Sequence, residues 1–369
     1  MQAFSAAFKN LRDPRSMRNR KHRFYDIIVL SILAVTAGAE SYEDIERYGK
    51  EKIDFLKGYL SLDHGIPSHD TINRLFQAIN PIVFQECFNA FTQQLVSNDN
   101  SRDIIPIDGK TSRGSRDTFS GKGPLHSVHA WSVENGICIA QQACDGKGNE
   151  LGAIRDMLDY LIIENCIITI DALGTQTDIV EKIINKGGDY VLAVKENQPN
   201  LSKKVHSITE NTTCVSDTTI TEKNRGRIET RRAEVFKNIP CEIGNKWMGL
   251  ETMIKITSTT EFPSGKTTFQ ERYYISSLDR DNDFNKIIRS HWQVENNLHW
   301  VLDMTFSEDD SRKRAKNAVA NFSILRKIVL NLLKQDKGKG SLKGKRKTAG
   351  WSDNYMLTLL KLHVIPRLF

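Results

Sequence analysis

Ile104-Ile105-Pro106-Ile107-Asp108 and Cys166-Ile167-Ile168-Thr169-Ile170-Asp171 are two short apolar runs, and each ends in a carboxylate. Their length and their isoleucine content predict buried strands. Residues 126–143 read as two further strands joined by Asn135-Gly136, which is a strong hairpin signal. Two segments with helical spacing and one more apolar strand complete this part of the chain, at residues 151–161, 175–186 and 190–194. Antiparallel strands followed by alternating strands and helices predict an α/β fold, a mixed sheet with helices packed on it.

The first hundred residues have helical patterning. The apolar run from Ile27 to Ala39 is thirteen residues long, with Asp26 before it and Glu40 after it. A membrane-spanning helix needs about twenty residues, so we expect a buried core helix and no membrane partner. A helix that Ser68 caps is either the recognition helix of a helix-turn-helix or part of a helical bundle.

The rest of the chain changes character twice. A β-rich stretch contains short strands at 218–221, 229–236, 253–258 and 272–277, and helices resume over 283–303 and 315–335. The run from Lys337 to Lys347 holds six basic residues and no acid, and its Gly and Ser residues predict a mobile loop. The expected segments are a helical N-terminal domain, the first part of an α/β core, a β-rich insertion, the C-terminal helices of the core, and a basic loop with a final helix, at residues 1–100, 101–211, 212–278, 279–336 and 337–369.

The amino-acid composition and the short motifs restrict the classes of function that we expect of this chain. The 369 residues include 52 Lys and Arg against 45 Asp and Glu, a net charge of +7 that modestly favours a polyanionic partner. The six cysteines are scattered, and no secretion signal opens the sequence, so we expect a reduced, cytoplasmic protein without a cysteine zinc site. Gly146-Lys147-Gly148 lacks the spacing of a P-loop, so ATP hydrolysis is unsupported.

Asp108 and Asp171 stand where the chain leaves a strand, which is where α/β proteins form their sites. Either residue alone is more typical of a turn or a helix cap. The pair is more informative, because the strands that flank the hairpin can bring both side chains together. Two anions at close range repel each other unless a cation lies between them.

Glu295 is a third candidate, in a segment whose apolar residues recur at helical spacing. His291, Glu295, His299 and Asp303 recur every four residues and form one polar stripe beside the apolar face. A Glu–His hydrogen-bond ladder in the core is one interpretation of this stripe, and a zinc site built by His291, Glu295 and His299 is another. Three carboxylate ligands, from Asp108, Asp171 and Glu295, instead favour Mg²⁺ or Mn²⁺.

Three carboxylates in a basic chain suit phosphoryl transfer. Two divalent ions about 3.5–4 Å apart can stabilise both the entering and the leaving oxygen of an in-line displacement. Nearby Lys and Arg side chains would bind the flanking phosphates. The reaction needs no protein nucleophile, and the sequence contains no Gly-x-Ser-x-Gly motif.

Eight segments spread over nearly the whole chain form a specific combination: Asp13-Pro14-Arg15, Gly65–Thr71, Ile107–Lys110, Thr169–Gln176, Gly188–Gln198, Gly226–Arg231, Tyr273–Leu278 and Ser290–Asp303. This combination resembles the DDE transposases of bacterial insertion sequences. The most similar group is the ISAs-type set, which includes the H-repeat-associated proteins found beside Rhs elements.

The resemblance implies an RNase H-like mixed sheet, a β-rich insertion before the glutamate helix and an all-helical N-terminal domain. It also implies that Asp108, Asp171 and Glu295 are the catalytic, metal-binding triad, with Mg²⁺ as cofactor and Mn²⁺ as a substitute. The implied partner is double-stranded DNA, both transposon ends and target. The implied assembly on DNA is a homodimer, in the bacterial cytoplasm and at the nucleoid when active.

We expect DNA contacts from polar residues beside these motifs. Related transposases often place Arg four residues before the Glu and Lys seven after it, and here those positions are His291 and Leu302. For the basic residues of the insertion, a solvated strand edge is the alternative. Trp292 and Trp300 are more typical of core packing than of base stacking. The expected DNA-binding residues are Arg113, Lys195, Gln198, Arg225, Arg227, Arg231, His291, Arg312 and Arg314.

The favoured function is a metal-dependent transposase that cuts a DNA strand at the end of its element, after which the freed 3′-hydroxyl attacks target DNA. One alternative is a catalytically silent transposase relic that still binds DNA. Another is a metal-dependent RNase H-like nuclease without strand transfer. A hydrolase that uses paired carboxylates, for example on sugars, is a further alternative, and the basic charge balance speaks against it.

Overall fold

The computed structural model of the chain describes residues 6–18, 20–96, 102–119, 121, 123–144, 146–224 and 226–361. Its N-terminal part is helical, as predicted. The apolar run forms α2 (Phe24–Thr36), a core helix whose residues from Asp26 onward are buried. The helices that follow are α3 (Tyr42–Glu51), α4 (Ile53–Lys57), α5 (His69–Ala78) and α6 (Pro81–Gln93). Among the helices that the structure describes, none combines the length and apolarity needed to cross a bilayer.

The helix that begins after Ser68 packs within this helical layer. The Ser68 hydroxyl accepts the backbone N–H of Thr71 and so caps α5. Ile72, Leu75 and Phe76 are buried on α5, which contacts α3 and, from the C-terminal part of the chain, α13 (Ala318–Gln335). This face of α5 is therefore used for packing between helices.

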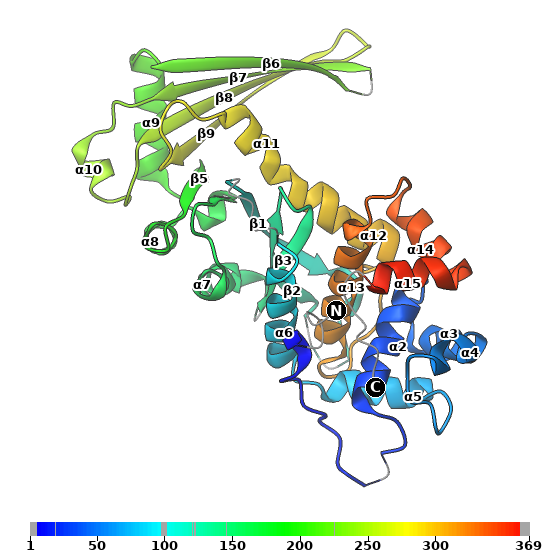
Figure 1. The fold of residues 1–369 in the computed structure, drawn as a ribbon. Coiled ribbons are helices and arrows are strands. Elements are labelled where there is room, and N and C mark those ends of the chain that lie inside the picture. Colours follow the sequence, from blue (N-terminus) through cyan, green and yellow to red (C-terminus); the bar gives the residue numbers. More distant parts are fainter. Residues whose placement is uncertain are drawn as a thin grey trace.

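One mixed sheet of nine strands runs through the molecule in the order β3-β2-β1-β4-β5-β9-β8-β7-β6 (Figure 1). The strands β1, β4 and β5 are parallel, and the other neighbours are antiparallel. The strands are β1 (Ile104–Ser112), β2 (Leu125–Ser132), β3 (Ile137–Cys144), β4 (Ile167–Ile170), β5 (Asp189–Val194), β6 (Ser216–Asn224), β7 (Arg227–Phe236), β8 (Thr252–Glu261) and β9 (Thr267–Ser276). The predicted mixed sheet flanked by helices is confirmed.

The four strands of the β-rich segment are longer than predicted, at nine or ten residues each. Their outer parts carry mainly polar side chains, so hydrophobic patterning does not reveal them, but backbone pairing continues along their whole length. Because β9 pairs with β5, these strands continue the core sheet. The segment boundaries expected from the sequence stay a prediction.

Helices cover the two faces of the sheet differently (Figure 1). Tyr190 and Leu192 of β5 belong to a large core that also includes side chains of α7, α8 and α9, whereas Val191 points to the other face and packs with Phe284 and Ile287 of α11. The carboxylates of interest lie on the α11 side. These helices and the remaining ones are α7 (Glu150–Tyr160), α8 (Thr177–Asn185), α9 (Pro199–Asn211), α10 (Cys241–Gly244), α11 (Phe284–Val294), α12 (Trp300–Phe306), α14 (Leu342–Trp351) and α15 (Asp353–Lys361).

The prediction of a mobile loop over 337–347 is wrong for the second half of this segment, which is helical. Ser341 caps α14 by accepting the N–H of Gly344 at 3.1 Å. Arg346 is buried and donates a hydrogen bond from Nη2 to the carbonyl of Val35 at 3.0 Å. This anchor lies more than 300 residues away in sequence, so local composition gives no sign of it.

Candidate active site

Two aspartates reach the α11 face from neighbouring parallel strands. The last paired residues of β1 and β4 are Ile107 and Ile170, so Asp108 and Asp171 follow at the same level, with backbones about 5 Å apart. Asp108 does not end its strand, as the sequence suggested, because β1 gains β2 as an antiparallel partner and continues to Ser112. Asp171 does leave the sheet, and its Oδ1 accepts the N–H of Leu173 at 3.0 Å at the start of a short 3₁₀ helix.

Glu295 comes from the helical layer. The α11 helix ends at Val294, the residues Glu295–His299 form one π-helical turn, and α12 continues from Trp300. The sequence predicted an uninterrupted helix here, since one wider turn changes the apolar spacing very little. Single π turns occur often at functional sites. Glu295, Asp108 and Asp171 line one cavity of about 920 Å³.

The polar stripe on this helical segment ties it to the sheet. Three of its four members contact a side chain on a strand, and each uses a different strand. The contacts are His291 Nδ1 to Thr169 Oγ1 at 3.0 Å, His299 Nε2 to His129 Nδ1 at 3.1 Å, and Lys110 Nζ to Asp303 Oδ1 at 2.7 Å. These contacts hold the π turn over β1, β2 and β4.

Glu295 is the fourth member of the stripe, and it is exposed to the cavity. The interpretation as a Glu–His ladder in the core is therefore wrong. The zinc interpretation gains no support, because His291 and His299 are both engaged with the sheet. Within the described ranges, no three His, Cys, Asp or Glu side chains converge closely enough to hold a metal ion. The three carboxylates share a cavity without forming a closed ligand shell.

The electrostatics of this cavity suit a cation. Burial raises the pKa of Asp108 to about 7, and the negative charges of Glu295 and Asp171 contribute to the rise. Burial also raises the pKa of Glu295, and it lowers that of His299 to about 3, so this imidazole is neutral. His299 Nδ1 lies 3.6 Å from Asp108 Oδ2. Carboxylate oxygens are the ligands that Mg²⁺ and Mn²⁺ prefer, and a divalent ion would relieve the repulsion that raises the pKa of Asp108.

The two predicted contacts after β5 separate in the structure. Lys195 is exposed and lines the carboxylate cavity. Gln198 turns away to the backbone, where its Nε2 donates to the carbonyl of Thr175 at 3.0 Å and to Oε1 of Gln176 at 3.2 Å. Gln198 thus shapes the turn after Asp171.

The basic residues of the insertion line a second cavity of about 790 Å³ along β7, β8 and β9. Arg227 and Arg231 both belong to its lining, whereas Arg225 lies outside the described residues. Each arginine already has an acidic partner, since Arg227 Nε lies 2.7 Å from Glu229 and Arg231 pairs with Glu222. Their positive charge is therefore partly balanced in the free protein.

Arg272 lines both cavities, and the sequence analysis missed it. Its guanidinium lies 5.2 Å from the ring centre of Trp292, which also lines both cavities. A signal was present, because Arg272 directly precedes the motif that starts at Tyr273. Trp292 is 41% exposed and Trp300 is 60% exposed, so the core packing expected for both is wrong.

The remaining predicted DNA contacts lie at the far end of β1 and after α12. Arg113 is exposed, with its Nε 3.6 Å from Asp309. Arg312 and Arg314 are exposed in the segment after α12, and Arg314 Nε donates to the carbonyl of Gly114 at 3.4 Å. In the described structure these three arginines lie outside the lining of the carboxylate cavity.

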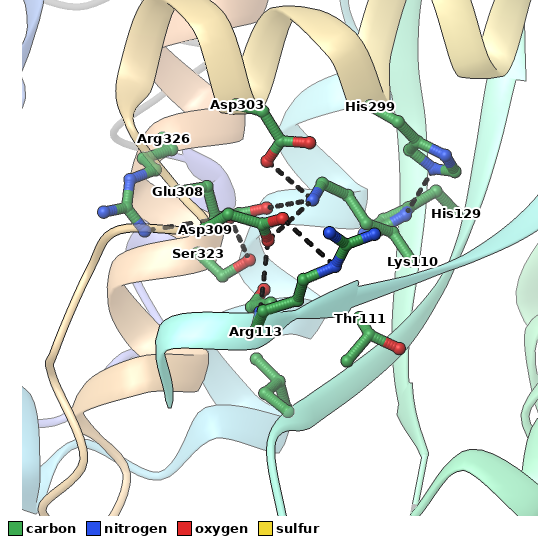
Figure 2. A network of polar contacts seen from close by, with 12 residues as sticks. Lys110, Thr111, Arg113, His129, His299, Asp303, Glu308, Asp309, Ser323 and Arg326 are labelled. Carbon is green, nitrogen blue, oxygen red and sulfur yellow. Dashed lines mark hydrogen bonds and ion pairs between the residues drawn. The ribbon is translucent and has the colours of Figure 1, made fainter. Parts of the chain in front are cut away.

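Lys110 is a second residue that the analysis of motifs passed over, although it ends the segment Ile107–Lys110. Figure 2 shows its side chain rising from β1 into a group of carboxylates. Its Nζ lies 2.7 Å from Asp303, 3.3 Å from Asp309 and 3.9 Å from Glu308, and the side chain is only 7% exposed. A lysine in such surroundings is held in one place by charge-assisted hydrogen bonds.

Comparison with known proteins agrees with this geometry. A family model described as "Transposase DDE domain" matches residues 99–332, and one described as "DDE_Tnp_1-associated" matches residues 5–92. The chain belongs to the DDE transposase family. It is a transposase, an enzyme that cuts DNA, and membership of this family implies the use of a divalent metal ion.

Relatives of this transposase in Escherichia coli match over almost their whole length. "H repeat-associated putative transposase YhhI" of strain K12 is 39% identical over 360 residues, which cover 94% of this chain and 95% of the relative. "Putative transposase YncI" of O157:H7 is 38% identical over 361 residues, with 94% and 92% covered. These matches confirm the Rhs-linked group expected from the motifs. A chain of the piggyBac transposase synaptic complex with hairpin DNA superposes with a TM-score of 0.43 at 12% identity, covering 99% of this chain and 79% of that chain, a score too low to support an argument.

Proposed function

We propose that this transposase cuts a DNA strand at the end of its element and joins the freed 3′-hydroxyl to target DNA, with Asp108, Asp171 and Glu295 as the metal-binding triad. The observation that supports this proposal is the shared cavity. Three carboxylates that lie far apart along the chain face it together, from two parallel strands and one π turn. The raised pKa of Asp108 supports the same assignment, since it reflects burial and the nearness of the other two charges.

Each residue of the cavity has a part in this chemistry. When bound, divalent ions would stabilise the entering and leaving oxygens of an in-line displacement at phosphorus. Lys195 and Arg272 bind the phosphates that flank the reacting one. His299 lies beside the triad, with its Nδ1 3.6 Å from Oδ2 of Asp108. In cutting, a water oxygen bonds to phosphorus and the 3′-oxygen leaves with a proton. In joining, the freed 3′-hydroxyl oxygen bonds to a target phosphorus and gives up its proton, and the 3′-oxygen of the target strand leaves and takes up a proton.

The finer assignments belong to the same proposal. Mg²⁺ is the working ion and Mn²⁺ substitutes for it, because all three ligands are carboxylates. The substrates are double-stranded transposon ends and double-stranded target DNA. Because an element has two ends, the active form on DNA is a homodimer with one catalytic cavity for each end. The site of action is the DNA of the bacterial nucleoid.

The test is Mg²⁺-dependent nicking of a duplex that carries the DNA flanking this gene. Asp108→Asn, Asp171→Asn and Glu295→Gln each lower the cutting rate by about 100-fold or more, since each removes a charged ligand. Glu181→Gln is the matched control, because it removes an exposed carboxylate from α8. Cutting that survives in Asp108→Asn contradicts the triad.

The same assay separates the alternatives. A wild-type protein that binds DNA in a salt-sensitive way but cuts it with neither Mg²⁺ nor Mn²⁺ is a silent relic. Cutting without a joined product identifies a nuclease that lacks strand transfer.

A further inference from the structure

Lys110 and Asp108 are two residues apart on β1, so their side chains leave the strand on the same face. This face is the one on which α11 and the π turn lie. Asp108 points into the carboxylate cavity, while Lys110 reaches further along the same helical layer to Asp303 on α12. One strand thus carries a proposed metal ligand and a cation that grips the opposite layer.

The carboxylates that surround Lys110 lie just beyond Glu295 in the chain. Asp303 is on α12, which continues directly from the π turn. Glu308 and Asp309 lie in the turn after α12, and the N–H of Arg113 donates to Asp309 Oδ1 at 3.1 Å (Figure 2). This turn is therefore docked on β1 at two places, at Lys110 and at the strand's end.

The far side of this cluster is anchored in α13. Glu308 is 1% exposed, accepts the hydroxyl of Ser323 at 3.0 Å, and lies 3.7 Å from Arg326 and 3.9 Å from Lys327. With Lys110 and Arg113, the cluster places four cations among three carboxylates. Buried charges of this kind are stable only in a well-defined geometry, since losing one partner leaves another uncompensated.

We propose that Lys110 is a positioning residue. By binding the strand that carries Asp108 to the helical segment that carries Glu295, it sets the distance between these two carboxylates. The inference rests on the triad proposed above. Asp108 and Glu295 belong to different layers, and the spacing of two layers under thermal motion depends on the contacts between them. Lys110 supplies the charged contact on the same strand as Asp108, two residues away. Metal affinity therefore depends on Lys110 although its Nζ is engaged elsewhere.

The experiment compares Lys110 with Lys327. Both are buried, and the Nζ of each lies 3.9 Å from Glu308, but Lys327 is on α13 and not on the strand of Asp108. Lys110→Gln, Lys110→Arg and Lys327→Gln are made in the full chain. Four quantities are measured on each variant: the thermal unfolding midpoint, Mn²⁺ affinity from the electron paramagnetic resonance signal of the free ion, the Mg²⁺ concentration for half-maximal DNA cutting, and DNA affinity.

Lys110→Gln weakens Mn²⁺ binding and raises the Mg²⁺ midpoint by about ten-fold, the scale of an outer-shell change at a metal site. DNA affinity stays unchanged, and Lys110→Arg recovers most of the metal affinity because it keeps the charge. Lys327→Gln lowers the thermal unfolding midpoint as much as Lys110→Gln does, but its Mn²⁺ affinity and its Mg²⁺ midpoint equal those of the wild type. If Lys110→Gln does not fold, Asp303→Asn takes its place, since Asp303 is 33% exposed and its loss removes only the shortest contact.

Equal metal affinity in Lys110→Gln and the wild type overturns the positioning role. An equal loss of metal affinity in Lys327→Gln also overturns this role, because the loss of affinity then follows from lower stability alone. A wild-type protein that neither binds Mn²⁺ nor cuts DNA contradicts the triad itself, and the inference falls with it. The two failures are therefore distinguishable.

Discussion

Asp108 is a partly buried carboxylate that faces two other carboxylates, and this arrangement costs stability when no cation is bound. Its side chain is 23% exposed, and burial, followed by the charges of Glu295 and Asp171, raises its pKa to about 7. The folded protein therefore holds a proton on Asp108 at pH values where the unfolded chain has lost it. Functional sites commonly trade stability for chemistry in this way.

The first prediction concerns the stability of Asp108→Asn without metal. Because the pKa of Asp108 is raised from 3.8 to about 7 in the folded state, wild-type stability falls as the pH rises between these two values. The asparagine variant has no such loss. In EDTA at pH 8 we expect it to be more stable than the wild type by about 4 kcal/mol, with no difference near pH 4. Thermal unfolding followed by circular dichroism over this pH range measures the difference.

The same series in saturating Mn²⁺ is the control, because an ion bound to the wild type adds stability that the variant cannot gain. A variant whose advantage in EDTA is the same at pH 4 and pH 8 contradicts the electrostatic account. Its gain would then come from packing or from the new amide.

Among the elements, those with a clear apolar pattern could be predicted and those held by distant partners could not. The hairpin, β4 and β5 follow from their sequences because they are apolar runs that the structure buries, and α8 follows because its apolar residues form one buried face. The π turn at Glu295–His299 leaves the apolar spacing almost unchanged, so the polar stripe could be predicted from the sequence. The sequence could not show that three residues of the stripe contact strands while the carboxylate of Glu295 faces the cavity. The Lys110 cluster needs three separate segments to meet, which no local pattern reports.

The helix α14 is another element that could not be predicted, because distant residues hold it in place. The composition of the segment 337–347 suggested a mobile loop, but Arg346 is buried and holds α14 in the fold. The guanidinium donates to the carbonyls of Val35 and Thr305 and lies 4.5 Å from the ring centre of Phe306. The neighbouring Lys347 is exposed.

The packing of α14 therefore depends on Arg346, and Arg346→Met tests this. The change removes the guanidinium hydrogen bonds to the carbonyls of Val35 on α2 and Thr305 on α12, so we expect a loss of about 2 kcal/mol in the free energy of unfolding. Lys347→Met, one residue further along α14, should stay within about 0.5 kcal/mol of the wild type. Urea unfolding midpoints compare the two variants. Equal midpoints would mean that the helix packs without this arginine.

At the scale of the whole molecule, one continuous sheet carries both aspartates of the carboxylate cavity and the basic insertion. The last core strand is β5, and β9 of the insertion pairs directly with β5. The carboxylate cavity and the cavity along β7 therefore lie against the same sheet. Arg272 on β9 lines both of them. Under the proposed function, a DNA strand that reacts at Asp108 continues along the insertion and meets Arg227.

The last prediction tests this path through the salt dependence of DNA binding. Each phosphate contact releases counterions, so losing one lowers the slope of log affinity against log salt concentration by about 0.9. Arg272→Gln and Arg227→Gln should each lower the slope by about this amount, measured by fluorescence anisotropy of a labelled duplex between about 50 and 200 mM NaCl. Lys343→Gln removes an equal charge from the exposed side of α14 and should leave the slope unchanged. If Lys343→Gln lowers it as much as Arg272→Gln does, the DNA lies over the C-terminal helices, and the two adjoining cavities do not mark its route.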